Sequence, residues 1–191
     1  DSMLWEPLRY LESCPSSDGA CAMVITSQDQ VGDRDVAWIK GMAVRSEGTL
    51  SAGRDEVNPQ AGIDCAKDIY NQAGITNPYK EIDCAEIYVP FSWYEPMWLE
   101  NLGFCELGEG WKVTDRDATA IDGEMPFNMS GGVLSSNPIG ASGMIRFGEA
   151  ALQVMGQAQD HQVENAKVAM GHAYGGAAQF FAMWIVSSSL D

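Results

Sequence analysis

Basic residues are scarce in this chain of 191 residues. Lysine and arginine together number 11, against 27 aspartates and glutamates, which gives a formal net charge of −16. A surface with this charge repels the phosphates of nucleic acids and anionic lipids. We therefore expect no nucleic-acid partner and no membrane partner. Basic contacts to a phosphate-rich ligand would have to come from elsewhere.

The chain also lacks the residue patterns of metal sites and of exported proteins. It has two histidines and five scattered cysteines, with no Cys-x-x-Cys pair, so no zinc pattern is present. No apolar run reaches the roughly 18 residues that span a bilayer. No basic segment followed by an apolar one opens the sequence. These features predict a cytoplasmic protein without a bound metal.

The apolar residues that are present alternate between strand-like and helix-like patterns. A continuous run of small apolar residues at 20–26 predicts a strand buried on both faces. Gly74 and Gly103 follow runs with helical spacing, as expected at helix ends. Further strands are predicted over 36–44, 82–89, 163–170 and 177–187, helices over 63–73, 91–102 and 144–157, and a tight turn over 171–176. This alternation indicates an α/β layered fold.

A glycine-rich stretch at 128–143 stands out in this pattern. It combines four glycines with a proline and several hydroxyl or amide side chains, and it leads into the predicted helix 144–157. Free N–H groups and the positive end of the dipole make a helix N-terminus a favourable place for an oxyanion or a polarised carbonyl. The stretch is therefore a candidate functional loop.

Five segments of the chain carry a family resemblance. Residues 14–22 read Cys-Pro-Ser-Ser-Asp-Gly-Ala-Cys-Ala, 82–87 read Ile-Asp-Cys-Ala-Glu-Ile, and 100–110 read Glu-Asn-Leu-Gly-Phe-Cys-Glu-Leu-Gly-Glu-Gly. The stretch 128–143 and the segment 171–177, Gly-His-Ala-Tyr-Gly-Gly-Ala, complete the set. In this order they resemble the C-terminal half of a thiolase of the sterol-carrier or lipid-transfer type.

The resemblance implies a thiolase-like layered α/β fold. In that family two similar halves each contain a mixed five-stranded sheet with helices on both faces, and the protein is usually dimeric. Residues 1–35 would be the end of the N-terminal half, with the return from the loop domain and the last strand, and residues 36–191 the complete C-terminal domain. The family's nucleophilic cysteine lies in the first half, and none of the five cysteines here matches its context. We expect this portion alone to be inactive.

The sequence departs from the family at three motif positions. Tyr88 stands where the family has histidine or asparagine, and Asn137 replaces the histidine of the Gly-His-Pro motif. Gly171 falls where biosynthetic thiolases have a cysteine, with His172 and Tyr174 beside it. Asparagine cannot accept a proton at neutral pH, but it can donate a hydrogen bond to an oxyanion. Another residue must therefore move the proton.

The resemblance suggests an enzyme acting on acyl-CoA thioesters, and three interpretations stay open. The first is thiolase-like acyl transfer to CoA with His172 as the base, since histidine titrates near neutrality. The second is retro-aldol cleavage of a 3-hydroxyacyl-CoA, in which a tyrosine takes the β-hydroxyl proton. The third is a non-catalytic subunit that binds acyl-CoA or lipid. The candidate catalytic residues are Tyr88, Asn137, His172 and Tyr174, and the candidate substrate-binding residues are Ser136, Gly140, Ser142, Gly175 and Gly176.

The resemblance also predicts partners. Coenzyme A is expected as a substrate or co-substrate, with no covalently bound cofactor. The expected protein partners are the N-terminal thiolase half, a second copy in a homodimer, and a small OB-fold, zinc-ribbon subunit that helps to bind the acyl-CoA.

Overall fold

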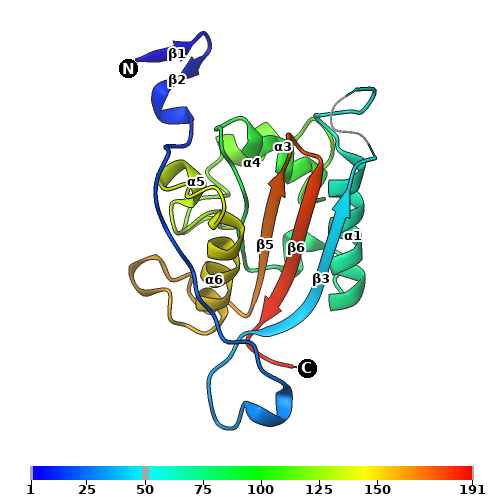
Figure 1. Cartoon of the computed structure of the whole chain (residues 1–191), viewed down its shortest axis with the longest axis vertical. Coiled ribbons are helices and arrows are strands. Elements are labelled where there is room, and N and C mark those ends of the chain that lie inside the picture. The colour runs from blue at the N-terminus through cyan, green and yellow to red at the C-terminus, as the bar shows by residue number, and fades with distance from the viewer. Residues whose placement is uncertain (1, 49–51, 191) are drawn as a thin grey trace.

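A mixed four-stranded sheet forms the centre of the fold (Figure 1). The computed structural model describes residues 2–48 and 52–190 of the chain. Within them the strand order is β3 (Trp38–Ser46), β6 (Phe180–Ser187), β5 (Val168–Gly175) and β4 (Cys84–Glu86). The β3–β6 and β6–β5 pairs are antiparallel, and the β5–β4 pair is parallel. The predicted mixed α/β class is confirmed.

The outer edge of β4 is extended by a single bridge. The Ala85 N–H donates to the Pro126 carbonyl at 2.9 Å, and the Asn128 N–H donates to the Ala85 carbonyl at 2.8 Å, around a parallel bridge between Ala85 and Phe127. Asn128 then adopts φ +53°, a left-handed conformation that ends the extended run. The expected fifth strand is thus reduced to this bridge, and the strand predicted over 82–89 forms a ladder only at Cys84–Glu86.

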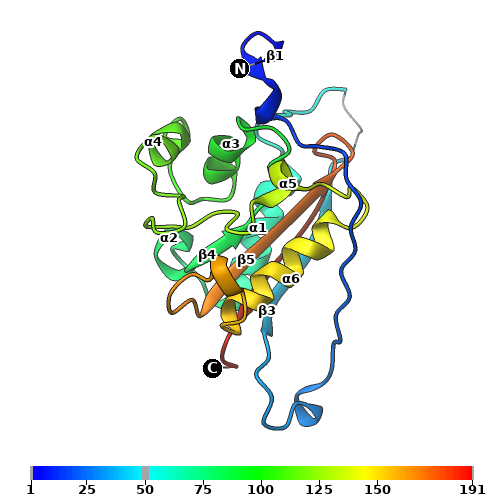
Figure 2. The same ribbon diagram turned by 90° about the vertical axis from the view of Figure 1, so that its left-hand side faces the viewer.

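Helices cover both faces of the sheet, as predicted. Helix α1 (Gln60–Ala73) packs on β3 and β6, while α6 (Ser142–Val154) packs mainly on β5, and less on β4 and β6, from the other face (Figure 2). Gly74 ends α1 at φ +72°, a conformation that glycine adopts without a steric penalty. The helices predicted over 63–73 and 144–157 are therefore confirmed, with slightly earlier starts.

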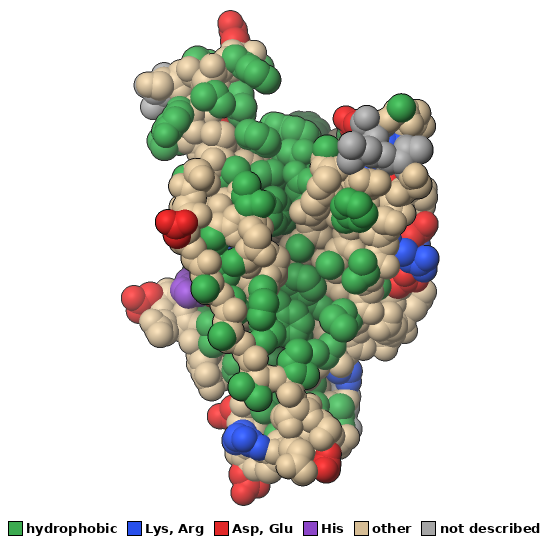
Figure 3. All heavy atoms as spheres, in the orientation of Figure 1, with side chains coloured by type: hydrophobic (Ala, Val, Ile, Leu, Met, Phe, Trp, Pro, Cys, Tyr) green, Lys and Arg blue, Asp and Glu red, His purple; other side chains and the backbone are tan. Residues whose placement is uncertain are grey.

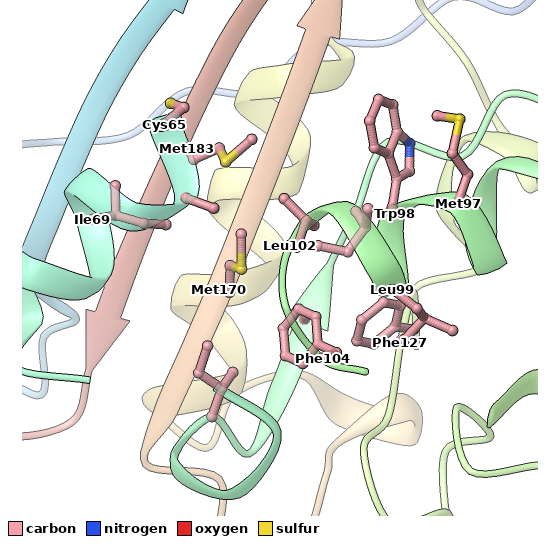
Figure 4. Close-up of a cluster of buried hydrophobic side chains, with 14 of the residues drawn as sticks. Cys65, Ile69, Met97, Trp98, Leu99, Leu102, Phe104, Phe127, Met170 and Met183 are labelled. Carbon is pink, nitrogen blue, oxygen red and sulfur yellow. The ribbon is translucent and has the colours of Figure 1, made fainter. Parts of the chain in front are cut away.

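The pleat of the sheet divides the core into two layers. Along β5 and β6, Met170, Phe181 and Met183 face the larger cluster on the α1 side. The intervening Ala169 and Trp184 face the smaller cluster under α6. Figure 4 shows Met170 and Met183 of the larger cluster lying between α1 and the segment that carries Trp98 and Leu102. Alternate residues of one strand therefore serve different layers.

Short elements surround this core. Figure 1 places α3 and α5 at the end of the sheet to which β5 points. In the described ranges, no helix is long and apolar enough to cross a membrane. The remaining elements are the hairpin β1 (Met3–Trp5) and β2 (Leu8–Arg9), the helices α2 (Pro78–Glu81), α3 (Tyr94–Asn101), α4 (Gly110–Asp115) and α5 (Gly132–Ser135), and 3₁₀ turns at Tyr10–Glu12, Gln28–Gln30 and Gln159–His161.

The strand predicted over 20–26 is not formed. This segment is an irregular strap that runs past α6 (Figure 2). Val24 is 94 % exposed and Ile25 is 72 % exposed. A strand needs a hydrogen-bonded neighbour on at least one edge, and no described strand lies beside this run. Local pattern alone could not supply that neighbour.

The tight turn predicted over 171–176 is also wrong. Strand β5 continues to Gly175, so His172 and Tyr174 lie inside a strand. The turn follows it, where Ala177 and Ala178 adopt φ +51° and +61°. The glycine at 171 serves packing instead, because a Cβ there would lie 1.9 Å from Nε1 of Trp184.

This contact makes Gly171 a sensitive position. We predict that Gly171→Ala lowers the free energy of unfolding by about 1–3 kcal/mol, because the rigid indole of Trp184 must move to admit the methyl group. Urea unfolding of the two proteins measures the change. The matched control is Gly175→Ala in the same strand, where an added Cβ meets no atom within 4 Å. Equal stability of the two variants would contradict the packing argument.

Candidate active site

The side-chain amide of Asn137 is the centre of the candidate site. The Tyr88 hydroxyl donates to its Oδ1 at 3.0 Å, and the Ser142 hydroxyl donates to the same oxygen at 2.7 Å. Because both neighbours bring a hydroxyl proton, the amide oxygen faces them and the NH2 group faces the other way. There Nδ2 donates to Sγ of Cys14 at 3.2 Å. Asn137 is only 3 % exposed, so its orientation is fixed.

Three elements bring these side chains together. Tyr88 lies two residues beyond the end of β4, Asn137 lies in the loop between α5 and α6, and Ser142 is the first residue of α6. The Pro138 carbonyl accepts the N–H groups of Ala141 and Ser142 at 2.7 and 3.1 Å, so a turn directly after Asn137 leads into α6. The predicted position of the glycine-rich loop at a helix N-terminus is confirmed.

The segment 14–17 completes the site from a distant part of the chain. Oγ of Ser17 accepts the Asn137 N–H at 2.8 Å and lies 3.1 Å from Oγ of Ser136. The Cys14 N–H donates to the Pro90 carbonyl at 2.8 Å, which holds its thiol beside Asn137. Neither Cys14 nor Ser17 was among the predicted site residues. The available signal was their place in the motif at 14–22, which the sequence analysis treated as a structural return.

His172 holds the backbone of Tyr88 and does not face the site opening. Its Nδ1 accepts the Tyr88 N–H at 3.3 Å, while the Trp98 indole donates to the Tyr88 carbonyl at 2.9 Å. His172 is fully buried, and its Nε2 has no hydrogen-bond partner among the described residues. Burial lowers the pKa of His172 to about 3, so the ring is neutral near pH 7. Burial thus makes the ring a weak base, and its Nδ1 is already occupied by the Tyr88 N–H.

Tyr174 reaches the site only through its ring. The rings of Tyr88 and Tyr174 meet edge to face at 5.2 Å, and Tyr94 stacks on Tyr174 at 5.5 Å. Burial raises the pKa of Tyr88, and it also raises the pKa of Tyr174. Both phenols are therefore protonated near neutral pH, and only the Tyr88 hydroxyl touches Asn137.

The predicted substrate-binding residues separate into two groups. Ser142 donates a hydrogen bond to the side chain of Asn137. Ser136 is linked to Asn137 through the hydroxyl of Ser17. Gly140 is exposed, with open space where a Cβ would lie. Gly175 and Gly176 lie where β5 turns into β6, and none of the hydrogen bonds described above joins them to Asn137.

An apolar cleft lies next to the site. Phe91 pairs with Ser13 in an antiparallel bridge three residues after Tyr88, and its side chain also lines this cleft. The volume of the cleft is about 650 Å³, and it is lined by Leu4, Trp5, Pro7, Leu8, Glu12, Phe91, Ser92 and Trp93. The site therefore combines a fixed polar centre with an apolar neighbour.

Comparison with known proteins gives a consistent set of relatives. Residues 28–188 match the family described as "Thiolase C-terminal domain-like". The chain is 33 % identical over 190 residues to an acetyl-CoA acetyltransferase of Methanothermobacter thermautotrophicus, covering 97 % of this chain and 49 % of that protein. It is 31 % identical over 177 residues to human sterol carrier protein 2, covering 88 % of this chain and 32 % of that protein.

A solved structure shares the fold over the whole chain. The Ltp2-ChsH2(DUF35) aldolase superposes with a TM-score of 0.83 at 24 % identity, covering all of this chain and 50 % of that one. The chain thus spans half or less of the length of these relatives.

The buried histidine predicts a pH dependence of stability. Because the pKa of His172 falls to about 3 in the folded state, the unfolded state binds one more proton below its ordinary value near 6.5. Stability from this group is complete above about pH 6.5 and falls by roughly 1.4 kcal/mol per pH unit toward pH 3. His172→Asn, which keeps an oxygen to accept the Tyr88 N–H, should flatten this slope in urea unfolding between pH 4 and 7.

The partly exposed His161 offers the control. It pairs with Glu149 at 3.0 Å on the surface, and His161→Asn should keep the slope of the parent protein. A parent slope equal to that of His172→Asn would show that residue 172 is not a buried neutral group.

Proposed function

The chain belongs to the thiolase C-terminal domain-like family, and on that premise we propose that it acts on acyl-CoA thioesters. The reaction makes or breaks a carbon–carbon bond, with acyl transfer to CoA. The observation that carries this proposal is the fixed Asn137 amide at the start of α6, with hydroxyl donors on its oxygen and its NH2 group turned away from them.

Asn137 takes the role of oxyanion donor. Two hydroxyl groups donate to its Oδ1, which turns the NH2 group toward Cys14. One hydrogen of Nδ2 is donated to Sγ of Cys14, and the other is left for a substrate oxygen. A donor that is oriented before the reaction stabilises the charge that develops on a thioester oxygen. The adjacent helix N-terminus adds to the same field.

Tyr88 takes the role of proton carrier. Its hydroxyl touches Asn137, and burial raises its pKa. The phenol is therefore protonated before the reaction and can donate to the α-carbon of an enolate left by cleavage. In the direction of condensation the same group takes that proton back.

Retro-aldol cleavage is the second candidate function. The observation that favours it is the pairing of a tyrosine hydroxyl with the oxyanion donor, while His172 is buried and neutral. In this reaction the Tyr88 oxygen takes the proton of a 3-hydroxyl group while the phenol passes its own proton to the α-carbon. The bond between the α- and β-carbons breaks, and an aldehyde or ketone leaves. Asn137 holds the thioester oxygen of the enolate in both schemes.

The N-terminal half of a thiolase is proposed as the main partner of this chain. On the α6 face, β3 and β6 carry exposed apolar side chains: Ile39, Met42, Val44 and Phe180 are 41–73 % exposed. Figure 3 shows hydrophobic side chains as a band along this face. We propose that residues 1–35 belong with that half and that the band packs against it.

The other expected partners remain proposals of the same kind. CoA is proposed as substrate or co-substrate, and a second copy would form a dimer. A small OB-fold, zinc-ribbon subunit would help to bind the acyl-CoA. The two-component name of the structural relative, Ltp2-ChsH2(DUF35) aldolase, supports a heteromeric assembly.

Turnover by the full-length protein tests the function. We predict that Tyr88→Phe lowers kcat by about 10²–10⁴-fold and that Asn137→Ala lowers it by about 10²–10³-fold. Loss of free CoA thiol with a 3-ketoacyl-CoA reports acyl transfer. Release of an aldehyde or ketone from a 3-hydroxyacyl-CoA reports retro-aldol cleavage.

Tyr79→Phe is the matched control for the tyrosine variant. Tyr79 bonds the exposed Glu124 and Arg116, so this variant should keep the parent rate. If the full-length protein turns over neither substrate, the enzyme proposal fails and a binding role is left. Binding of acyl-CoA without turnover would support that role.

The apolar strap at residues 20–26 tests the assembly. We predict that Ile25→Glu separates or destabilises the N-terminal half, because burying an unpaired carboxylate costs several kcal/mol or more. Analytical ultracentrifugation and limited proteolysis of the full-length protein measure this. The control is Val57→Glu on a surface loop, where the side chain is 59 % exposed. An unchanged assembly in Ile25→Glu would show that the strap stays solvated.

A further inference from the structure

A buried ion pair lies directly behind the candidate site. Nη1 of Arg146 lies 2.8 Å from Oε2 of Glu86, and the side chains are 4 % and 0 % exposed. Burial raises the pKa of Glu86, and the Arg146 charge opposes that shift. Glu86 stands in an otherwise apolar strand and Arg146 in an apolar helix. These two charged positions were the sequence signal for this pair.

Ser130 closes the network from the glycine-rich loop. Its N–H donates to Oε1 of Glu86 at 3.1 Å, and its hydroxyl donates to Oε2 at 2.9 Å. Nη1 of Arg146 donates to Oγ of Ser130 at 3.2 Å. One carboxylate therefore holds both a helix and a loop.

Each of the three elements that form the site has one residue in this network. Glu86 is the last residue of β4 and precedes Tyr88 by two residues. Arg146 follows Ser142 by four residues, so both lie on one face of α6. Ser130 lies seven residues before Asn137 in the same connection. The network thus joins the same three elements as the site, through a different residue of each.

We propose that Glu86, Arg146 and Ser130 are positioning residues that set the distance between the Tyr88 hydroxyl and the Asn137 amide. This inference rests on the proposed function, because it assigns the network to the reaction carried out at that pair. A buried ion pair can often be replaced by neutral residues without loss of stability. Positioning and stability can therefore be separated by experiment.

The test is the paired variant Glu86→Gln/Arg146→Met in the full-length protein. It removes both charges together, so no unpaired charge is left buried. We expect Tm to stay close to that of the parent, while kcat falls by about 100-fold, since a displacement of about 1 Å at reacting groups has that effect. KM for the acyl-CoA should change by less than about threefold, because the variant changes none of the candidate substrate-binding residues.

Two further sets of variants keep the test decisive. Ser130→Ala removes only the hydroxyl and should lower kcat, and Ser130→Thr should restore most of it. Arg45→Met/Asp68→Asn removes an exposed ion pair on β3 and α1 and should keep parent turnover. If Glu86→Gln/Arg146→Met does not fold, the serine pair decides the matter alone.

Crystal structures of the parent and of Ser130→Ala supply a readout that does not depend on turnover. The inference requires the hydrogen bond of 3.0 Å between Tyr88 Oη and Asn137 Oδ1 to lengthen or break in the variant. An unchanged bond together with unchanged kcat would overturn it. A parent protein without turnover would contradict the proposed function. The crystal structures would still decide whether the network sets the distance between Tyr88 Oη and Asn137 Oδ1.

Discussion

The pleat of the sheet is the constraint on which the arrangement of the site depends. Successive residues of a strand point to opposite faces, so β5 sends His172 and Tyr174 into the layer shared with Trp98 and Phe181. At the end of β4 the same rule points Glu86 toward α6, where it meets Arg146. Tyr88, two residues later, meets Asn137. The direction in which each side chain points therefore decides whether it lies in the aromatic layer or reaches Asn137.

Burial then decides which polar groups can act. His172 sits among aromatic rings, where desolvation keeps it neutral and makes it an acceptor for the Tyr88 backbone. Asn137 is equally buried but carries no charge, and its oxygen is satisfied by two hydroxyls. An amide suits this position because it supplies a donor without the cost of burying a charge. The loss of the motif histidine is therefore compatible with an ordered oxyanion site.

The uneven cover of the sheet fits the length of the relatives. Helix α1 and its neighbours close one face, whereas α6 packs on β5, β4 and β6 and leaves exposed apolar side chains of β3 and β6 on the other. The open part carries apolar side chains, and the chain spans half or less of the relatives' length. Exposed apolar faces of this kind are typical of contact surfaces, in agreement with the proposed packing against an N-terminal half. The strap at 20–26, apolar yet solvated, belongs to the same surface.

The sequence by itself determined the order of the main strands and helices from residue 36 onward and the glycine-rich loop at the start of α6. These follow from local pattern, such as helical spacing ended by Gly74. The replacement of both motif histidines by Tyr88 and Asn137 followed from the family resemblance. Only the tertiary structure decided that His172 lies within a strand. It also decided that the thiol of Cys14, 123 residues before Asn137, accepts a hydrogen bond from the Asn137 side-chain amide. It also left residues 20–26 without a neighbouring strand. The physical reason is the same in each case: burial, strand face and long-range pairing depend on residues that are far apart in the chain.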